Sequence, residues 1–300
     1  KRAKAKLVYD AHELETDRNL PMVRFEKAYR SVAERLLIGQ CDAVITVSDS
    51  IARYLAERYR IPTPIVVLNA PMTRADAACS DLRADLGLLP DQPLALYVGG
   101  LVPGRGIDQA IRTLVYLPDL QLAVLGPRQE ATLKRTTELA EKLGVRQRLH
   151  IVDPVSPEGV GTYIASADVS LILLRNTCLN HMFCFPNKLL QSLLSGLPVV
   201  ASRLVELERM VAMTGAGLIA DETDPAAIGE AVRRILSEPE RFRPTPTLIR
   251  SLELSHGWTT QKKNLVALYH ALSGLPTDDV DHRSPSVRRG APILSSGPSV

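Results

Sequence analysis

The sequence predicts an α/β protein built from two doubly wound parallel sheets, of which the first is incomplete. Short apolar strands alternate with helical segments along most of the 300 residues. This alternation is typical of parallel sheets with helices on both faces. A polar, turn-rich stretch from Thr73 to Gln92 interrupts the pattern. We therefore expect two units joined by a linker, each large enough to bury a core.

The first unit is expected over residues 1–72 and shows only about three strands. The predicted strands and helices are strand 7–9, helix 20–39, strand 43–47, helix 49–60 and strand 65–68. Ser48 lies directly before the second helix, where a hydroxyl side chain serves as an N-cap. A doubly wound domain of ordinary size holds more strands than this. We therefore expect that the chain is N-terminally incomplete.

The second unit is expected over residues 73–250 and repeats the alternation. Its predicted elements are strands 94–98, 122–125, 149–152, 169–174 and 199–201, and helices 107–115, 131–143, 160–165, 186–195 and 226–236. A last helix, Thr259 to Leu272, falls in the segment 251–275. Residues 276–300 are rich in proline, serine and charge, a composition that predicts a disordered tail.

Composition excludes several classes of protein. Aromatic residues make up 4% of the chain and the net charge is +3, which argues against recognition of nucleic acids. No stretch reaches the roughly 18 apolar residues that a membrane span requires. The basic residues among the first six are interpreted as a frayed terminus, with a contact to a membrane surface as the alternative.

The cysteine pattern argues for a reducing compartment and against a zinc site. The four cysteines, Cys41, Cys79, Cys178 and Cys184, form neither a CxxC pair nor a Cys/His metal pattern. So few cysteines in a chain of this length are typical of a cytoplasmic protein. If the basic terminus contacts lipid, the expected location is the inner membrane surface.

A glycine-rich loop is the first candidate for chemistry. Gly99 to Gly106 follows a strand, precedes a helix and contains Gly100 and Arg105. Glycines allow the backbone to approach a phosphate, and a helix N-terminus favours negative charge. Arg105 adds a cation with forked donors. The spacing matches neither the dinucleotide fingerprint nor a Walker A loop, so a tight structural turn remains the alternative.

The helix that begins at Pro186 is the second candidate. Helical spacing places four leucines on one face and Lys188, Gln191, Ser192 and Ser195 on a polar face. Lys188 and Gln191 then point the same way, one turn apart, near the helix N-terminus. This arrangement suits an anionic ligand that carries hydroxyl groups, with a solvated helix face as the alternative.

These segments together resemble one family of proteins. Tyr97-Val98-Gly99-Gly100 with Arg105-Gly106-Ile107-Asp108, and Pro186-Asn187-Lys188 with Gly196-Leu197-Pro198-Val199-Val200-Ala201-Ser202, resemble the family 4 glycosyltransferases of the GT-B fold, in the branch with a PNKLFEYM-like helix. Tyr9-Asp10-Ala11-His12-Glu13 and the strand 43–47 with Ser48 resemble the acceptor-side segments of that branch. Trp258 and Tyr269 resemble its C-terminal helix, which returns to the first domain.

The resemblance implies a role for each matching residue. It implies that Gly99, Gly100, Arg105, Asn187 and Lys188 bind the donor, with both cations on its diphosphate. It implies that Gln191 takes the place of the second glutamate of the family's pair, which holds the ribose hydroxyls. His12 matches the catalytic-site histidine near the transferring sugar. The position of the first glutamate is Phe183, and Gly100 stands where many relatives have an arginine.

The expected function follows from these matches. Two Rossmann-like domains would face each other across a cleft, and a sugar would pass from a nucleotide-diphosphate sugar to an unknown acceptor. The expected reaction retains the anomeric configuration, uses no metal and no cofactor, and serves polysaccharide or glycoconjugate biosynthesis. The alternatives are a sugar-nucleotide epimerase on the same fold and a catalytically degenerate subunit that binds a nucleotide or a partner.

Overall fold

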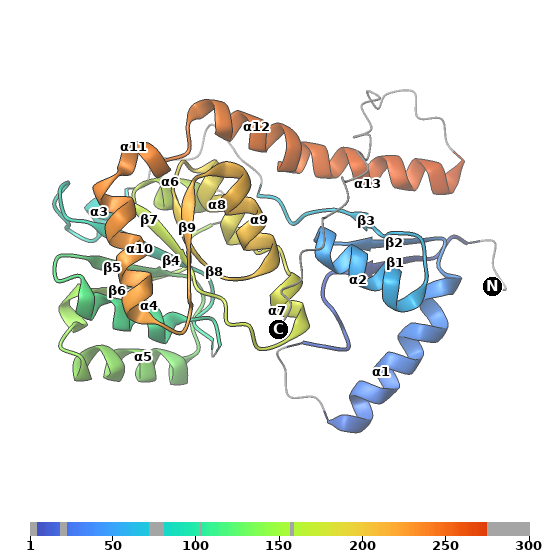
Figure 1. Cartoon of the computed structure of the whole chain (residues 1–300), viewed down its shortest axis with the longest axis horizontal. Coiled ribbons are helices and arrows are strands. Elements are labelled where there is room, and N and C mark those ends of the chain that lie inside the picture. Colours follow the sequence, from blue (N-terminus) through green and yellow to red (C-terminus); the bar gives the residue numbers. More distant parts are fainter. Residues whose placement is uncertain (1–4, 19–22, 72–80, 103, 157–158, 275–300) are drawn as a thin grey trace, which may run out of the picture.

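The structure is a computed structural model that describes residues 5–18, 23–71, 81–102, 104–156 and 159–274 (Figure 1). The tail expected over 276–300 lies outside these residues. The described chain forms two α/β halves, each built on its own parallel sheet, which confirms the predicted fold class.

The first half holds a three-stranded parallel sheet in the order β1-β2-β3. Its elements are β1 (Val8–Ala11), α1 (Arg24–Leu37), the 3₁₀ turn η1 (Ile38–Gln40), β2 (Ala43–Thr46), α2 (Asp49–Tyr59) and β3 (Ile65–Val66). Ser48 caps α2 as expected, because its hydroxyl accepts a hydrogen bond from the Ile51 amide at 3.1 Å. The strand predicted at 65–68 is shorter in the structure and ends at Val66.

The second half holds a six-stranded parallel sheet in the order β6-β5-β4-β7-β8-β9. Its strands are β4 (Leu94–Val98), β5 (Gln121–Leu125), β6 (Leu149–Val152), β7 (Val169–Ile172), β8 (Val199–Ser202) and β9 (Gly217–Ala220). Numbered within this half, the order is 3-2-1-4-5-6, the order of dinucleotide-binding sheets. The order reverses between β4 and β7, at the centre of the sheet.

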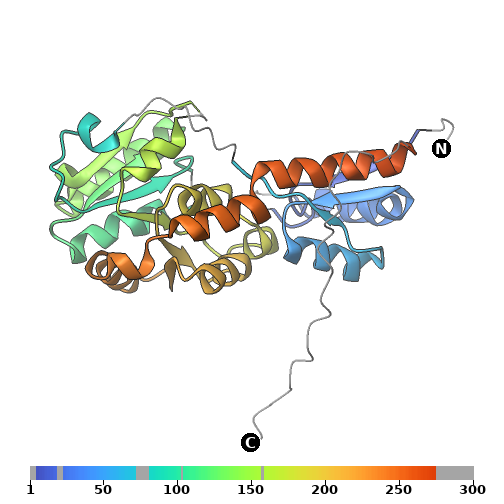
Figure 2. The ribbon, with the colours of Figure 1, turned by 90° about the horizontal axis from the view of Figure 1, so that it is seen from above.

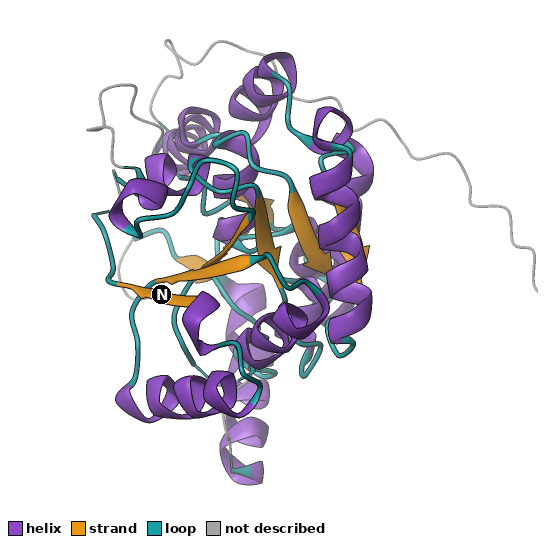
Figure 3. Cartoon of the chain, turned by 90° about the vertical axis from the view of Figure 1, so that its left-hand side faces the viewer, coloured by secondary structure: helices purple, strands orange, loops and turns teal. Residues whose placement is uncertain are grey.

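Helices cover both faces of this second sheet (Figure 3). They are α3 (Leu82–Asp85), α4 (Ile107–Thr113), α5 (Glu130–Lys142), α6 (Val160–Ala165), α8 (Asn187–Leu194), α9 (Val205–Thr214), α10 (Pro225–Ser237) and α11 (Pro239–Phe242), with 3₁₀ turns η2 (Leu114–Tyr116) and η3 (Arg146–Arg148). One core lies between the sheet and α4, α5 and α10. Two further cores lie under α8 and α9 and under α3 and α6.

Asp168 stands directly before β7 and has a structural role. Its carboxylate accepts hydrogen bonds from the Arg83 guanidinium at 2.5 Å and from the Leu94 amide at 2.8 Å. The side chain thereby ties α3 and the start of β4 to the start of β7.

Within the described residues, two helical segments connect the halves. The chain leaves the second half through α12 (Pro246–His256) and returns along the first half as α13 (Trp258–Ser273), as Figures 1 and 2 show. The buried Gln261 of α13 accepts a hydrogen bond from the Leu68 amide at 3.0 Å, which fixes the helix to the segment after β3. None of the helices in the described ranges is both long and apolar enough to cross a membrane.

The short helix α7 (Leu179–Phe183) is the second connection, and the sequence did not predict it. It follows β7 in the chain, yet Leu179 and Phe183 pack against the core of the first half. The Phe183 ring lies 5.8 Å from the Tyr54 ring of α2, centre to centre. Helix α7 therefore belongs to the second half by sequence and to the first half by packing.

Candidate functional site

The reversal of strand order between β4 and β7 defines the candidate site. Ligands of open α/β sheets bind beyond the carboxyl ends of the strands at such a point. The loops that follow β4 and β7 meet there. Gly106 has φ of 76°, and a Cβ at this position would lie 1.9 Å from the Leu173 carbonyl oxygen. Only glycine allows this contact, so the glycine-rich loop is pressed against the loop after β7.

A lysine and an arginine gather around Tyr97 at this point. The Lys188 Nζ lies 4.8 Å from the centre of the Tyr97 ring. The buried Tyr97 hydroxyl donates to the Arg105 backbone carbonyl at 3.1 Å, and burial raises its pKa to about 12. The Arg105 side chain is exposed. The structure thus brings together two of the predicted donor-binding residues, one from each predicted segment.

The Lys188 ammonium differs from the solvated cation that helix periodicity suggests. Part of the residue is exposed, but the Nζ atom is buried and has no hydrogen-bond partner within the described part of the chain. Burial, reinforced by the nearby Arg105 charge, lowers the pKa of Lys188 to about 8. A buried ammonium without acceptors is costly, so this group is poised for an anionic partner.

Helix α8 keeps only part of its predicted polar face. The four leucines, Leu189, Leu190, Leu193 and Leu194, are buried as expected. Ser192 is wrongly placed on the polar face by the sequence: it is fully buried, and its hydroxyl donates to Ser170 of β7 at 2.9 Å. Asn187 is exposed at the helix start and Gln191 is half-buried one turn later. The open face of α8 is therefore narrower than the sequence predicts.

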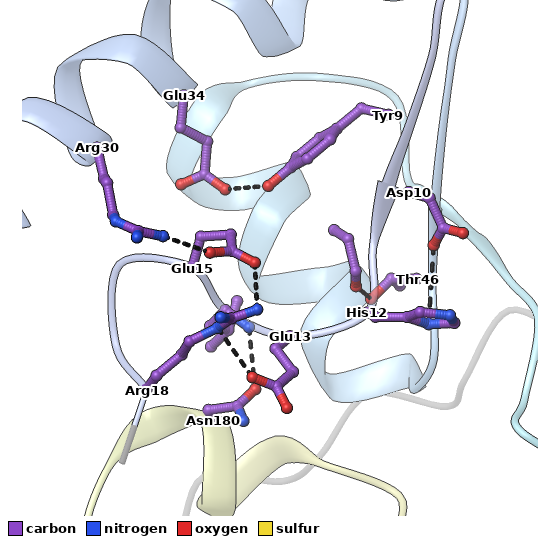
Figure 4. A network of polar contacts seen from close by, with 12 residues as sticks. Tyr9, Asp10, His12, Glu13, Glu15, Arg18, Arg30, Glu34, Thr46 and Asn180 are labelled. Carbon is purple, nitrogen blue, oxygen red and sulfur yellow. Dashed lines mark hydrogen bonds and ion pairs between the residues drawn. The ribbon is translucent and has the colours of Figure 1, made fainter. Parts of the chain in front are cut away.

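His12 follows β1 in the first half and is the predicted catalytic-site residue. Its side chain is 58% exposed, and its Nδ1 lies 3.8 Å from an Asp10 carboxylate oxygen (Figure 4). The other neighbour that could orient the ring, Glu13, instead pairs with the Arg18 guanidinium at 2.8 Å. Side chains therefore constrain the imidazole only weakly, and its position is set mainly by the backbone of the loop that carries it.

Helix α7 contributes two site residues that no sequence pattern indicated. Asn180 is buried, and its Oδ1 accepts a hydrogen bond from the Leu14 amide at 2.9 Å. His181 Nδ1 lies 2.8 Å from the Arg175 carbonyl oxygen, an acceptor, so Nδ1 carries the proton. Burial lowers the pKa of His181. The hydrogen bond to the Arg175 carbonyl and the Glu13 charge oppose this shift, and the Arg105 charge adds to it. Helix α7 therefore lies between the cations of the second half and the loop of His12.

The described residues contain no group of three or more His, Cys, Asp or Glu side chains placed to hold a metal ion. A different hollow, of about 380 Å³, lies between the halves and is lined by residues that include Glu206, Arg209 and His256. Glu206 is buried there and accepts a hydrogen bond from the Ser50 amide at 2.8 Å.

The second half matches a known family over most of its length. The family model described as "Glycosyl transferases group 1" matches residues 80–245, more than half of the chain. The chain belongs to this family. A second model, described as "Glycosyltransferase Family 4", matches residues 1–71 of this group 1 glycosyltransferase.

Its curated relatives include D-inositol 3-phosphate glycosyltransferases. That of Corynebacterium urealyticum is 26% identical over 87% of this chain and 64% of the relative. That of Nocardia farcinica is 25% identical over 88% of this chain and 61% of the relative. The chain thus spans about three-fifths of the length of these relatives.

Solved structures share the fold of this group 1 glycosyltransferase. Sucrose-phosphate synthase from Thermosynechococcus elongatus superposes with a TM-score of 0.73 at 21% identity, over 89% of this chain and 68% of that one. HepE of Anabaena, solved in complex with UDP, superposes with a TM-score of 0.71 at 15% identity, over 90% of this chain and 72% of that one. At these identities the likeness establishes the GT-B fold, with its two Rossmann-like halves.

Proposed function

We propose that this group 1 glycosyltransferase moves a sugar from a nucleotide-diphosphate sugar to an acceptor, with retention of configuration and without a metal ion. The observation that carries the proposal is the pair of cations, Arg105 and Lys188, beyond the strand-order reversal of the second sheet. The Lys188 ammonium is buried and has no acceptor among the residues that the structure describes, and a diphosphate supplies acceptor oxygens and the opposite charge.

Each part of the site has a role in this reaction. The diphosphate leaves with developing negative charge, which Arg105, Lys188 and the N-terminal amides of α8 stabilise electrostatically. Gln191, one turn along α8, accepts a hydrogen bond from a ribose hydroxyl, and Asn187 at the helix start binds the donor beside it. Gly99 and Gly100 let the backbone approach the donor closely. His12, on the opposite half, lies near the transferring sugar.

The donor base is proposed from the structural neighbours. HepE of Anabaena was solved with UDP and with UDP-glucose, so uridine nucleotides are the first probes to use. The curated relatives are D-inositol 3-phosphate glycosyltransferases, so D-inositol 3-phosphate is the acceptor that their name gives. It is the first acceptor to test, with water as the reference acceptor.

One observation favours a second candidate function. The position that the resemblance gives to the first glutamate is Phe183, which packs into the core of the first half. A side chain committed to packing cannot bind a sugar hydroxyl. A catalytically degenerate subunit that binds a nucleotide sugar without transferring it is therefore the second candidate.

Calorimetry with UDP and UDP-glucose, followed by assays of UDP release with and without D-inositol 3-phosphate, tests both candidates. Micromolar binding together with UDP release supports transfer. Binding with no release for any acceptor, water included, supports the degenerate subunit. No binding of any nucleoside diphosphate overturns both candidates.

A further inference from the structure

His12 lies between two hydrogen bonds that fix the backbone on either side of it (Figure 4). On one side, the Thr46 hydroxyl of β2 donates to the Ala11 carbonyl at 2.9 Å. On the other side, the Leu14 amide donates to the Asn180 Oδ1 at 2.9 Å. The first bond stays within the first half, whereas the second reaches across to α7. The backbone of His12 is therefore placed partly by the second half.

The contact at Asn180 is buried and well defined. Asn180 is 8% exposed and Leu14 is 2% exposed. The backbone amide of Asn180 also donates to the Asp17 carbonyl at 3.3 Å. The backbone amide of Asp17 donates in turn to the Leu14 carbonyl at 2.9 Å and so closes a turn. An amide that lost its acceptor at this depth would be left unsatisfied, which is costly. The loop after β1 is thereby attached to α7 at two backbone positions.

The far end of α7 is fixed as well. The Ser48 hydroxyl of the first half donates to the Phe183 carbonyl at 2.6 Å. Five residues further along the chain from Phe183 stands Lys188. A displacement of α7 would therefore change the position of His12 relative to the cation pair.

We propose that Asn180 is a positioning residue, which sets the loop of His12 at the distance from the Arg105 and Lys188 site that sugar transfer requires. The inference rests on the proposed function, because it gives His12 and the cations one common substrate. Among the described residues, the side chain that can orient the exposed ring of His12 is Asp10, whose carboxylate lies 3.8 Å away. The position of such a side chain follows its backbone, and small displacements in an active site are costly in rate.

Three variants test this role. Asn180→Ala removes the acceptor for the Leu14 amide. Asn180→Asp keeps an acceptor oxygen on a side chain of the same length and is the conservative variant. Asn176→Ala makes the same chemical change at an exposed side chain in the segment before α7. The hydrogen bond that Asn176 donates to Glu222 comes from its backbone amide, which the substitution keeps. Thermal melts show that each variant is folded before it is assayed.

The first readout is hydrogen exchange of the Leu14 amide by NMR, which needs no activity. Asn180→Ala should speed exchange by at least about threefold, as expected for one lost hydrogen bond. Asn180→Asp and Asn176→Ala should leave exchange within about twofold of the wild-type chain. Unchanged exchange in Asn180→Ala overturns the proposal.

The second readout separates kcat from donor affinity, with UDP-glucose as donor and water or D-inositol 3-phosphate as acceptor. Asn180→Ala should lower kcat about tenfold or more while the Kd for UDP stays within about twofold. Asn180→Asp should recover most of the lost rate. A normal kcat in Asn180→Ala, a matching loss of UDP affinity, or an equal loss in Asn176→Ala overturns the positioning role. A wild-type chain that binds UDP but transfers no sugar overturns the proposed transferase function, and the positioning role with it, even where Leu14 exchange responds as expected.

Discussion

The Lys188 ammonium lies over the ring of Tyr97, with its Nζ 4.8 Å from the ring centre. The contact offers the cation a favourable aromatic face. It does not offset the loss of water, because burial still lowers the pKa of Lys188 to about 8. At neutral pH the side chain is therefore still charged, but it holds its proton less firmly than an ordinary lysine does.

Binding of UDP should weaken above pH 8. Below that pH, Lys188 is already protonated and binds the diphosphate without taking up a proton. Above it, binding must first protonate the amine, so the Kd should rise toward about tenfold per pH unit. Calorimetry at pH 9 in two buffers of different ionisation enthalpy should show uptake of close to one proton, and at pH 6.5 almost none. A Kd that is flat from pH 7 to pH 9.5 would contradict this role of Lys188.

Lys188→Met should make the chain more stable and unable to bind UDP. Between about pH 8 and the ordinary lysine pKa of 10.5, Lys188 is less protonated in the folded chain than in the unfolded chain. The contribution of Lys188 to the free energy of unfolding therefore rises with pH across that window. At pH 7 the buried charge is a net cost, and methionine removes it at similar volume. We expect a gain of about 1 kcal/mol, or about 2–4 °C in Tm.

Denaturant unfolding of Lys188→Met at pH 7 and pH 10 provides the check. The gain should be largest at pH 7 and smaller at pH 10, where the wild-type amine is neutral when folded. A methionine variant less stable than wild type at pH 7 would show that the ring contact outweighs the burial cost.

Arg105→Ala should weaken UDP binding and leave stability unchanged within about 0.5 kcal/mol, because the Arg105 side chain is exposed. The loss of a charged hydrogen bond to phosphate corresponds to about 1.5–3 kcal/mol, or roughly 10- to 150-fold in Kd. Arg243→Ala is the matched control: it is also exposed, and it lies with Pro93 and Pro198 at the other end of the strands. Equal effects of the two variants on calorimetric Kd would remove Arg105 from the site.

Gly106→Ala should destabilise the second half by about 3 kcal/mol or more. A Cβ there would lie 1.9 Å from the Leu173 carbonyl oxygen, and φ is 76°. Gly39→Ala is the control, because nothing lies within 4 Å of its added Cβ. Thermal unfolding should separate the two variants clearly. A Gly106→Ala chain with wild-type Tm would mean that the two loops at the strand-order reversal are not in contact.

The sequence predicts the strands of the second half well because their apolar runs are short and bounded by turn residues. The strand at 149–152 and the helix at 160–165 have the predicted bounds. Strand β9 and helix α9 were missed. Charged residues interrupt α9, and the glycines at 215 and 217 suggest a loop. Gly217 is in fact required within β9, because a Cβ there would lie 2.3 Å from the Val199 carbonyl oxygen.

The site was predictable only where local pattern decides it. Arg105 and Lys188 could be singled out from a glycine loop and a helix start. The burial of the Lys188 ammonium could not be predicted, because helical periodicity shows on which face of the helix a residue lies and not where its side chain points. Asn180 and Leu14 are 166 positions apart in the chain, and no local signal connects them. Ser192 was misplaced for the same reason, since one of its partners is Ser170 of strand β7, 22 positions earlier in the chain.

Gln191→Glu should tighten donor binding by about two- to fivefold. Gln191 is half-buried one turn beyond Lys188 on α8, at the position that the resemblance assigns to a ribose-binding glutamate. An ionised carboxylate accepts a stronger hydrogen bond from a hydroxyl than a neutral amide does. Two effects oppose this gain: repulsion from the donor diphosphate, and the cost of removing water from a new charge.

The gain should exceed these costs for two reasons. The ribose separates Gln191 from the phosphates, and Gln191 keeps some contact with solvent, so its charge is not fully desolvated. The added carboxylate would also raise the pKa of the nearby Lys188 ammonium and so favour the form that binds phosphate. Gln147→Glu, an exposed substitution before β6, controls for the change in net charge. Calorimetry with UDP decides the outcome: abolished binding would place Gln191 against the diphosphate, and an unchanged Kd would mean that this face of α8 meets only solvent.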